Sequence, residues 1–163
     1  MKKIWMFLFL FGGLSLIAFS QEAPAAEDVT DDELKKFANV EFMTSEFVEK
    51  KTGELKDMIL NNEVIGGGAR YNEIKDAWGD AAKEAEIELT EEERAAYKAI
   101  KDFQDSLQES VVEYKTELIK DDEVLGVSIY NKVNGAIKED PAMKEKLDQM
   151  VEEMKGEDED GAV

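Results

Sequence analysis

The chain of 163 residues contains nearly the same pattern twice, about sixty residues apart. A Thr-x-x-Glu pair at Thr30 and Glu33 returns at Thr90 and Glu93. Glu-Val-Ile-Gly at 63–66 returns as Glu-Val-Leu-Gly at 123–126. A repeat of this length that occurs only twice indicates duplication of a helical hairpin, in which each copy covers the apolar face of the other. The repeat constrains the architecture and assigns no activity.

Both copies carry the signals of long helices. Each Thr-x-x-Glu pair is a capping box, which satisfies free amide groups at a helix start. The long helices should end near Gly66 and Gly126, because glycine suits a left-handed helix end. Shorter helices are expected over residues 69–86 and 128–138, and a last helix over 141–154. The predicted fold class is all-α: an antiparallel helical bundle built from two duplicated helical hairpins plus a short C-terminal helix.

The apolar seam of the long helices differs between the copies. In the second copy it follows a step of three and four residues, which is typical of a helix that faces a partner; its members are Tyr97, Ile100, Gln104, Leu107, Val111, Tyr114 and Leu118. The equivalent first-copy seam has Thr44, Lys51 and Glu54 in its middle, where Val48 and Leu55 could replace them after a slight rotation. This polar middle could be satisfied within a monomer or by a homodimer, and it is the stretch most suited to a specialised surface.

The first twenty residues have the composition of an export signal. Lys2 and Lys3 precede an apolar run over residues 4–19, and small residues at 18 and 20 favour cleavage before Gln21. The alternative, an uncleaved anchor, has a run shorter than the ~20 residues of a membrane span. The predicted organisation is a signal peptide (1–20), a flexible leader (21–29), a helical domain (30–155, with repeats 29–88 and 89–154) and an acidic disordered tail (156–163). The localisation expected is periplasmic or extracellular.

The chain is strongly acidic, with a formal net charge of −19. Nucleic acid and anionic membrane surfaces are therefore poor partners, and no stable membrane insertion is expected after cleavage. A cationic protein or a divalent ion would be attracted, although charge spread along a chain also serves solubility or a saline habitat. The sequence has no cysteine, so core packing alone must stabilise an exported domain.

At this point the repeated residues resemble a known family. Thr-x-x-Glu-Leu-x-x-Phe-Ala at 30–38, the glycine turn, Tyr-Asn-x-Ile at 71–74 and Asp-Pro-x-Met at 140–143 are similar to the bacterial domain of unknown function 4168, apparently as two tandem copies. The resemblance implies a small, exported, helical protein whose molecular role is not established, with no catalytic residues to transfer. The chain departs from the pattern at 79–82, which lack Asp-Pro, and at Arg94, which replaces Leu34.

The residue types present argue against an enzyme. Histidine and cysteine are both absent, which removes the commonest general base, the thiolate nucleophile and the usual zinc and di-iron ligands. A carboxylate pair remains conceivable, but 39 acidic residues give it no specificity. We expect no cofactor. Residues 121–123 and 157–160 could attract calcium weakly, although neither has the alternating spacing that wraps the ion.

A Tyr-Asn pair occurs once in each copy, at Tyr71 and Asn72 and again at Tyr130 and Asn131. These residues are either two equivalent recognition sites or a core tyrosine beside an asparagine that bonds the turn backbone; we favour the second interpretation. The leading functional hypothesis is an exported, non-enzymatic protein that acts by protein contact in the bacterial envelope. The alternatives are a holdase-like periplasmic chaperone, suggested by Leu-Thr at 89–90, and a weak calcium binder.

Overall fold

The computed structural model describes residues 28–160, with side chains described up to Gly156, so the predicted signal peptide and most of the leader lie outside the described residues. This part contains six helices and no strand, which confirms the all-α class: α1 (Asp31–Leu60), α2 (Gly68–Ala77), α3 (Ala81–Glu86), α4 (Glu91–Lys120), α5 (Val127–Glu139) and α6 (Pro141–Asp160). Within these residues no helix combines the length and apolar character that crossing a membrane requires.

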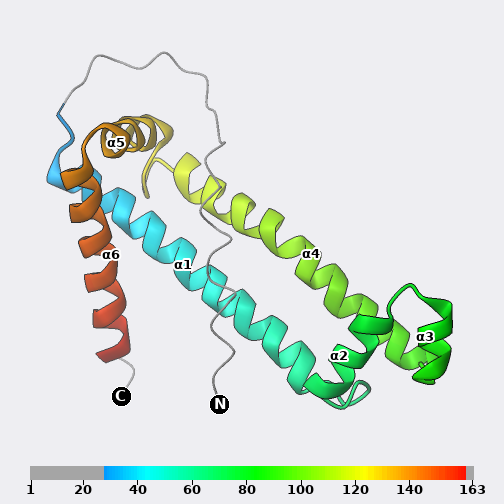
Figure 1. Ribbon diagram of the computed structural model, residues 1–163. Helices are drawn as coiled ribbons and strands as arrows, with labels where there is room; N and C mark the ends of the chain where they lie inside the picture. Colours follow the sequence, from blue (N-terminus) through cyan, green and yellow to red (C-terminus); the bar gives the residue numbers. More distant parts are fainter. Residues whose placement is uncertain (1–27, 161–163) are drawn as a thin grey trace.

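The two long helices, α1 and α4, run antiparallel side by side and form the body of an elongated molecule (Figure 1). The shorter helices gather at its two ends. Helices α2 and α3 lie where α1 ends and α4 begins, and α5 lies where α4 ends and α1 begins. Helix α6 then packs against α1 and α5. The middle of the α1–α4 pair is therefore a two-helix region between two thicker ends.

Both predicted capping boxes are present. The Glu33 amide donates to the Thr30 hydroxyl at 3.2 Å, and the Thr30 amide donates to the Glu33 carboxylate at 2.8 Å. Thr90 and Glu93 repeat the arrangement at 3.1 and 2.9 Å. The first turn of each long helix, which lies within the box, consists of acidic residues, and negative charge is favourable at this positive end of the helix dipole. Local sequence thus fixes where both long helices start.

The long helices end earlier than predicted. The long helices end at Leu60 and Lys120, so Gly66 and Gly126 are not their C-terminal caps. Both glycines do have a positive φ, +72° and +82°, but they lie in the turn that leads into the next helix. The turn closes on itself: at Gly126 the amide donates to the Asp121 carbonyl at 3.0 Å. A compact hydrogen-bonded turn, rather than a single glycine cap, therefore ends α4.

Two glycine substitutions should change stability in opposite directions. A Cβ on Gly126 would lie 2.9 Å from Oδ1 of Asp122 at a φ that side chains rarely adopt, so Gly126→Ala should lower the free energy of unfolding by at least about 1 kcal/mol. Gly135 lies inside α5 with open space around a Cβ, so Gly135→Ala should raise it by about 0.5 to 1 kcal/mol. Urea denaturation followed by circular dichroism measures both, and an equal effect of the two changes would contradict the assignment.

Two further boundaries differ from prediction. The single helix expected over 69–86 is broken at Trp78 and Gly79, because Gly79 has a φ of +82° and Asp80 caps a new helix through the amides of residues 82 and 83. The last helix continues beyond Met154 to Asp160, so residues 156–160 are helical rather than part of a disordered tail. One glycine within a run of Glu, Lys and Met costs about 1 kcal/mol, which does not stop a helix.

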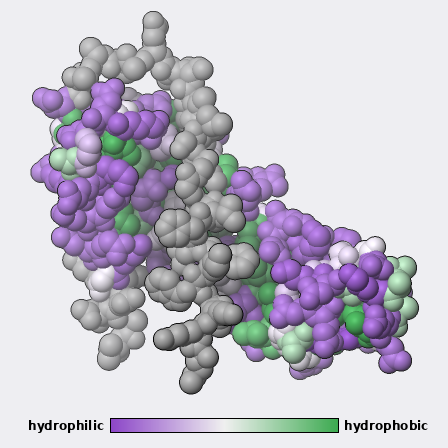
Figure 2. Space-filling view, viewed as in Figure 1, coloured by the Kyte–Doolittle hydropathy of each residue, from purple (hydrophilic) through white to green (hydrophobic). Residues whose placement is uncertain are grey.

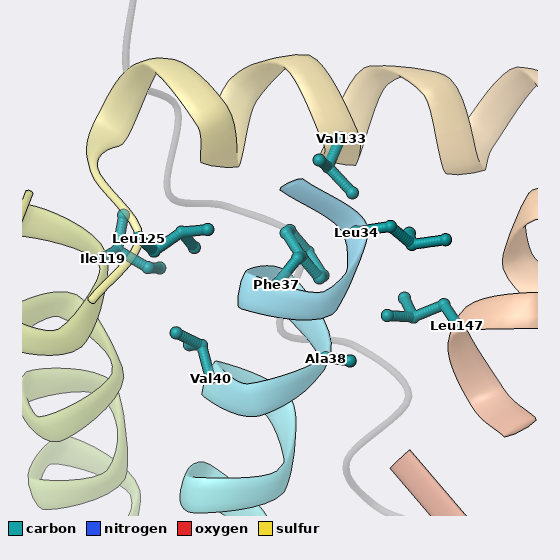
Figure 3. Close-up of a cluster of buried hydrophobic side chains, with 8 residues drawn as sticks. All are labelled: Leu34, Phe37, Ala38, Val40, Ile119, Leu125, Val133 and Leu147. Carbon is teal, nitrogen blue, oxygen red and sulfur yellow. The ribbon is translucent and has the colours of Figure 1, made fainter. Parts of the chain in front are cut away.

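Most of the buried side chains form two separate clusters, one at each end of the long helices. The first cluster, shown in Figure 3, joins α1, the end of α4, the following turn, α5 and α6; it contains Leu34, Phe37, Ala38, Val40, Ile119, Leu125, Val133 and Leu147. The second joins the turn after α1, α2 and the start of α4; it contains Ile65, Tyr71, Ile74, Tyr97 and Ile100. Residues of both sequence repeats therefore contribute to each end, and the duplication itself stays a prediction.

The clusters explain one difference between the copies. Leu34 is buried beside Leu147 of α6, since α6 extends along the start of α1 (Figure 3). Arg94, at the equivalent place in α4, has only the six-residue α3 nearby; it donates to the Glu84 carboxylate at 2.6 and 3.2 Å and lies over the Trp78 ring at 5.6 Å. Position 34 is therefore apolar because α6 covers it, and position 94 is charged because its side chain remains partly exposed to solvent.

Candidate functional site

The four residues of the Tyr-Asn pairs do not form one site. Tyr71 is buried in the second cluster, with its ring 5.4 Å from that of Tyr97. Tyr130 is partly buried against the first cluster at the other end, where its ring stacks on Phe37 at 5.5 Å. Burial raises the pKa of both hydroxyls above the ordinary value, so neither is prepared to act as a base. Their positions are those of core tyrosines.

The asparagines behave differently from the favoured interpretation. Asn72 is exposed and Asn131 is partly buried, and neither side chain forms a hydrogen bond with another described residue. The expected bond from asparagine to the turn backbone is therefore wrong for this pair. Asn62 does make it: its carboxamide oxygen accepts from the amides of Val64 and Ile65 at 3.1 Å. The turn-forming asparagine lies inside the turn, ten residues before the one singled out.

The best-connected carboxylates hold the ends together. Glu93 accepts from Arg70 of α2 at 2.7 and 3.0 Å while it closes its capping box, and these bonds from Arg70 and from the Thr90 amide lower its pKa to about 2. Glu33 accepts from Lys132 of α5 at 2.9 Å, and the hydrogen bonds from the Thr30 amide and from Lys132 lower its pKa as well. A general acid needs a raised pKa, so these carboxylates are structural.

The acidic turn at 121–123 also has a structural role. Asp121 ends α4, and its carboxylate accepts from the Glu123 amide at 2.9 Å. Its placement at a helix C-terminus is explained by the turn that it builds, which removes the reason for invoking an ion there. Among the residues with described side chains, no group of three or more acidic side chains is arranged to hold a metal. The run at 157–160 lies outside the described side chains.

The middle of the α1–α4 pair contains aromatic residues that belong to neither cluster. Phe47 of α1 stacks on Tyr114 of α4, with ring centroids 4.3 Å apart and planes 11° apart. Phe103 of α4 lies on the same side, because the Lys51 ammonium lies over both its ring and that of Phe47, at 5.6 and 5.7 Å. All three rings are partly exposed. Aromatic side chains thus reach the surface where, among residues 28–160, only α1 and α4 are present.

The opposite edge of the same helix contact is polar. Lys115 donates to Glu41 at 2.6 Å across α4 and α1, and Thr44 is buried with its hydroxyl donating to the Val40 carbonyl at 2.6 Å. On the aromatic side, Lys51, which lies over the Phe47 and Phe103 rings, is neutralised by Glu54 at 2.7 Å. The polar middle predicted for the first seam is therefore satisfied within one chain. The aromatic rings lie on one side of the two-helix region, and the Lys115–Glu41 ion pair lies on the other.

The aromatic side continues as an uncharged strip along α4. It comprises Ala99, Phe103, Ser106, Leu107, Ser110 and Tyr114, which a rotation of 100° per residue places within one arc of about 100°. We call these six residues the neutral strip. No Asp, Glu, Lys or Arg falls within this arc from Ala99 to Tyr114, although 36% of the chain is charged. Figure 2 shows hydrophobic surface midway along the molecule, between ends that are mostly hydrophilic.

The serines of the neutral strip donate their hydroxyl groups to the backbone of their own helix. Ser106 donates to the Phe103 carbonyl at 2.8 Å, and Ser110 donates to the Leu107 carbonyl at 3.0 Å. Such bonds to the preceding turn use the only side-chain donor of each serine. The strip consequently has no charge and no unpaired serine hydroxyl donor, and its chemistry suits an apolar contact.

Sequence reasoning missed part of this surface. Gln104 was assigned to the seam, but it is exposed, and Phe103 contacts Lys51 of α1 instead. The sequence did contain this alternative. A step of three residues from Ile100 leads to Phe103, and a step of four then leads to Leu107; a step of four followed by a step of three passes through Gln104 instead. On α1 Leu55, one of the two residues that a slight rotation would bring into the seam, packs against the second cluster, as does Met58 of the unrotated seam.

Comparison of the chain with protein-family models, with curated proteins and with solved structures finds no match. The resemblance to the domain of unknown function 4168 therefore stays a prediction that depends on the quoted residues alone.

Proposed function

We propose that this chain is an exported, non-enzymatic protein that acts by contact with another protein in the bacterial envelope. The observation that carries the proposal is the neutral strip: partly exposed Phe103, Leu107 and Tyr114 lie together on α4, outside both clusters. Partly exposed apolar surface bordered by polar residues is typical of protein interaction sites. The predicted signal peptide supports the location, and the absence of histidine and cysteine supports a role without catalysis.

A photo-crosslinking amino acid at Ser106 tests the proposal. Ser106 is exposed on the neutral strip, and Gln108, also exposed and uncharged, lies about 160° away around the same helix. After irradiation of cells that produce the protein, the analogue at Ser106 should yield a crosslinked envelope protein, and the analogue at Gln108 should yield several-fold less. Equal yields at the two positions, or crosslinks to no protein at either, would contradict contact through this strip.

A further inference from the structure

We infer that the neutral strip binds a basic amphipathic α-helix of a partner protein, laid along α4. The inference rests on the proposed function and names the chemistry of the partner. From Ala99 to Tyr114 the strip spans sixteen residues, whose fifteen steps of about 1.5 Å cover about 22 Å or four helical turns. Three of its six side chains are small, namely those of Ala99, Ser106 and Ser110, and small side chains let two helix axes approach closely. Length and shape both suit a helix of about sixteen residues.

The apolar face of such a helix has a defined counterpart. Phe103, Leu107 and Tyr114 project between the small residues at steps of four and seven, which matches the spacing of apolar residues on one side of another helix. Phe47 widens this surface onto α1 through its stack on Tyr114. Because the strip serines bond their own backbone, the contact buries no unpaired hydroxyl.

The charge of the partner follows from the border of the strip on α4. Glu113 borders the strip on its outer side, and Glu117, four residues later, falls within the arc of the strip just beyond its end at Tyr114; both are exposed, and neither forms an ion pair with another described residue. The border on α1 is mixed, since Lys50 is exposed there while Lys51 is neutralised by Glu54. Net attraction for lysine or arginine is therefore on the α4 side.

The net charge of the whole chain selects among possible occupants. At −19, a second copy would be repelled at long range, and so would an anionic membrane surface. A cationic helix is instead steered toward the protein, and its apolar face then gives the contact its specificity. A basic helix satisfies both the strip and its border.

Binding of two synthetic peptides to the purified protein tests this inference. Both are sixteen-residue amphipathic helices with the same leucine face, and one has lysine flanks while the other has glutamate flanks. We expect the lysine peptide to bind at least tenfold more tightly by fluorescence anisotropy. Ser106→Glu should weaken it at least tenfold, and the exposure of Ser106 allows the variant to fold, which circular dichroism verifies.

A charge-matched pair of variants separates the strip from general attraction. Glu113→Lys with Glu117→Lys should weaken the lysine peptide at least tenfold. Glu139→Lys with Glu145→Lys makes the same change in net charge at exposed positions on α5 and α6, and should weaken it less than threefold. Equal losses in both double variants would overturn the inference, because binding would then depend on net charge alone.

Three other outcomes would also overturn it. Equal binding of both peptides would indicate an unselective apolar surface of the holdase kind. Sedimentation that shows self-association abolished by Ser106→Glu would make a second copy the occupant. Failure of both peptides to bind would reject the helical partner. The crosslinking comparison of Ser106 with Gln108 remains an independent test, so the proposed function can stand when this inference fails.

Discussion

Leu125→Ala is expected to lower the free energy of unfolding by about 3 kcal/mol. Leu125 has no exposed surface and lies in the first cluster between the end of α4 and the start of α5. Removing its side chain leaves a cavity among Phe37, Ile119 and Val133, which belong to three different helices and cannot all move inward. Urea denaturation monitored by circular dichroism at 222 nm, a standard wavelength for helix, gives the free energy.

The same substitution at Leu60 supplies a matched control. Leu60 is 50% exposed at the end of α1, so Leu60→Ala should change the free energy of unfolding by less than about 0.5 kcal/mol. The comparison keeps the substitution the same and changes only how deeply the leucine is buried and whether it lies in a turn or at a helix end. Similar losses in the two variants would mean that the first cluster does not stabilise the fold in the way described.

Glu93→Gln is expected to destabilise the protein at pH 7 by about 1 to 2 kcal/mol. The Glu93 side chain is only 13% exposed, and it both closes the capping box of Thr90 and accepts two hydrogen bonds from Arg70. Glutamine keeps the shape, loses the charge and can accept at one oxygen only. Glu92→Gln, one residue earlier in the same turn and exposed, should cost less than about 0.5 kcal/mol.

The cost of Glu93→Gln should depend on pH in a defined direction. The pKa of Glu93 falls from the ordinary 4.5 to about 2 on folding, chiefly through its hydrogen bonds with Arg70. A lowered pKa contributes stability that is fully present above pH 4.5 and is lost as the pH falls toward 2. The difference between wild type and variant should therefore shrink between pH 5 and pH 2. A difference that stays constant when denaturation is measured at pH 7, 4 and 3 would contradict this assignment.

Much of the fold follows from local sequence. Capping boxes at Thr30 and Thr90 set the starts of α1 and α4, because a hydroxyl and a carboxylate three residues apart satisfy the free amides whatever the rest of the chain does. Helix ends were harder to predict. The turns after Leu60 and Lys120 are closed by hydrogen bonds to Asn62 and Asp121, and glycine alone does not reveal where such a turn begins.

Less of the candidate site was predictable. The seam of α4 was identified by its period, but Phe103 and Gln104 are neighbours, and only the rotation of α4 against α1 decides which one faces Lys51. The Tyr-Asn pairs attracted attention because they repeat, and repetition here reflects core packing at Tyr71 and Tyr130. The neutral strip lies on α4, in the second copy only. Residues shared by the two copies therefore could not reveal it, and only positions at which the copies differ could.

The first cluster has a consequence for the order in which the chain can fold. It joins Leu34 with Leu147, and an ion pair at 2.7 Å connects Asp31 with Lys146 across 115 residues. During synthesis the apolar side of α1 therefore remains uncovered until α6, near the end of the polypeptide, has left the ribosome. The end of the fold that contains the first cluster therefore stays open for most of synthesis, and a segment that is still unfolded can pass through a translocation channel. Late closure of the N-terminal helix thus agrees with the export proposed for this protein.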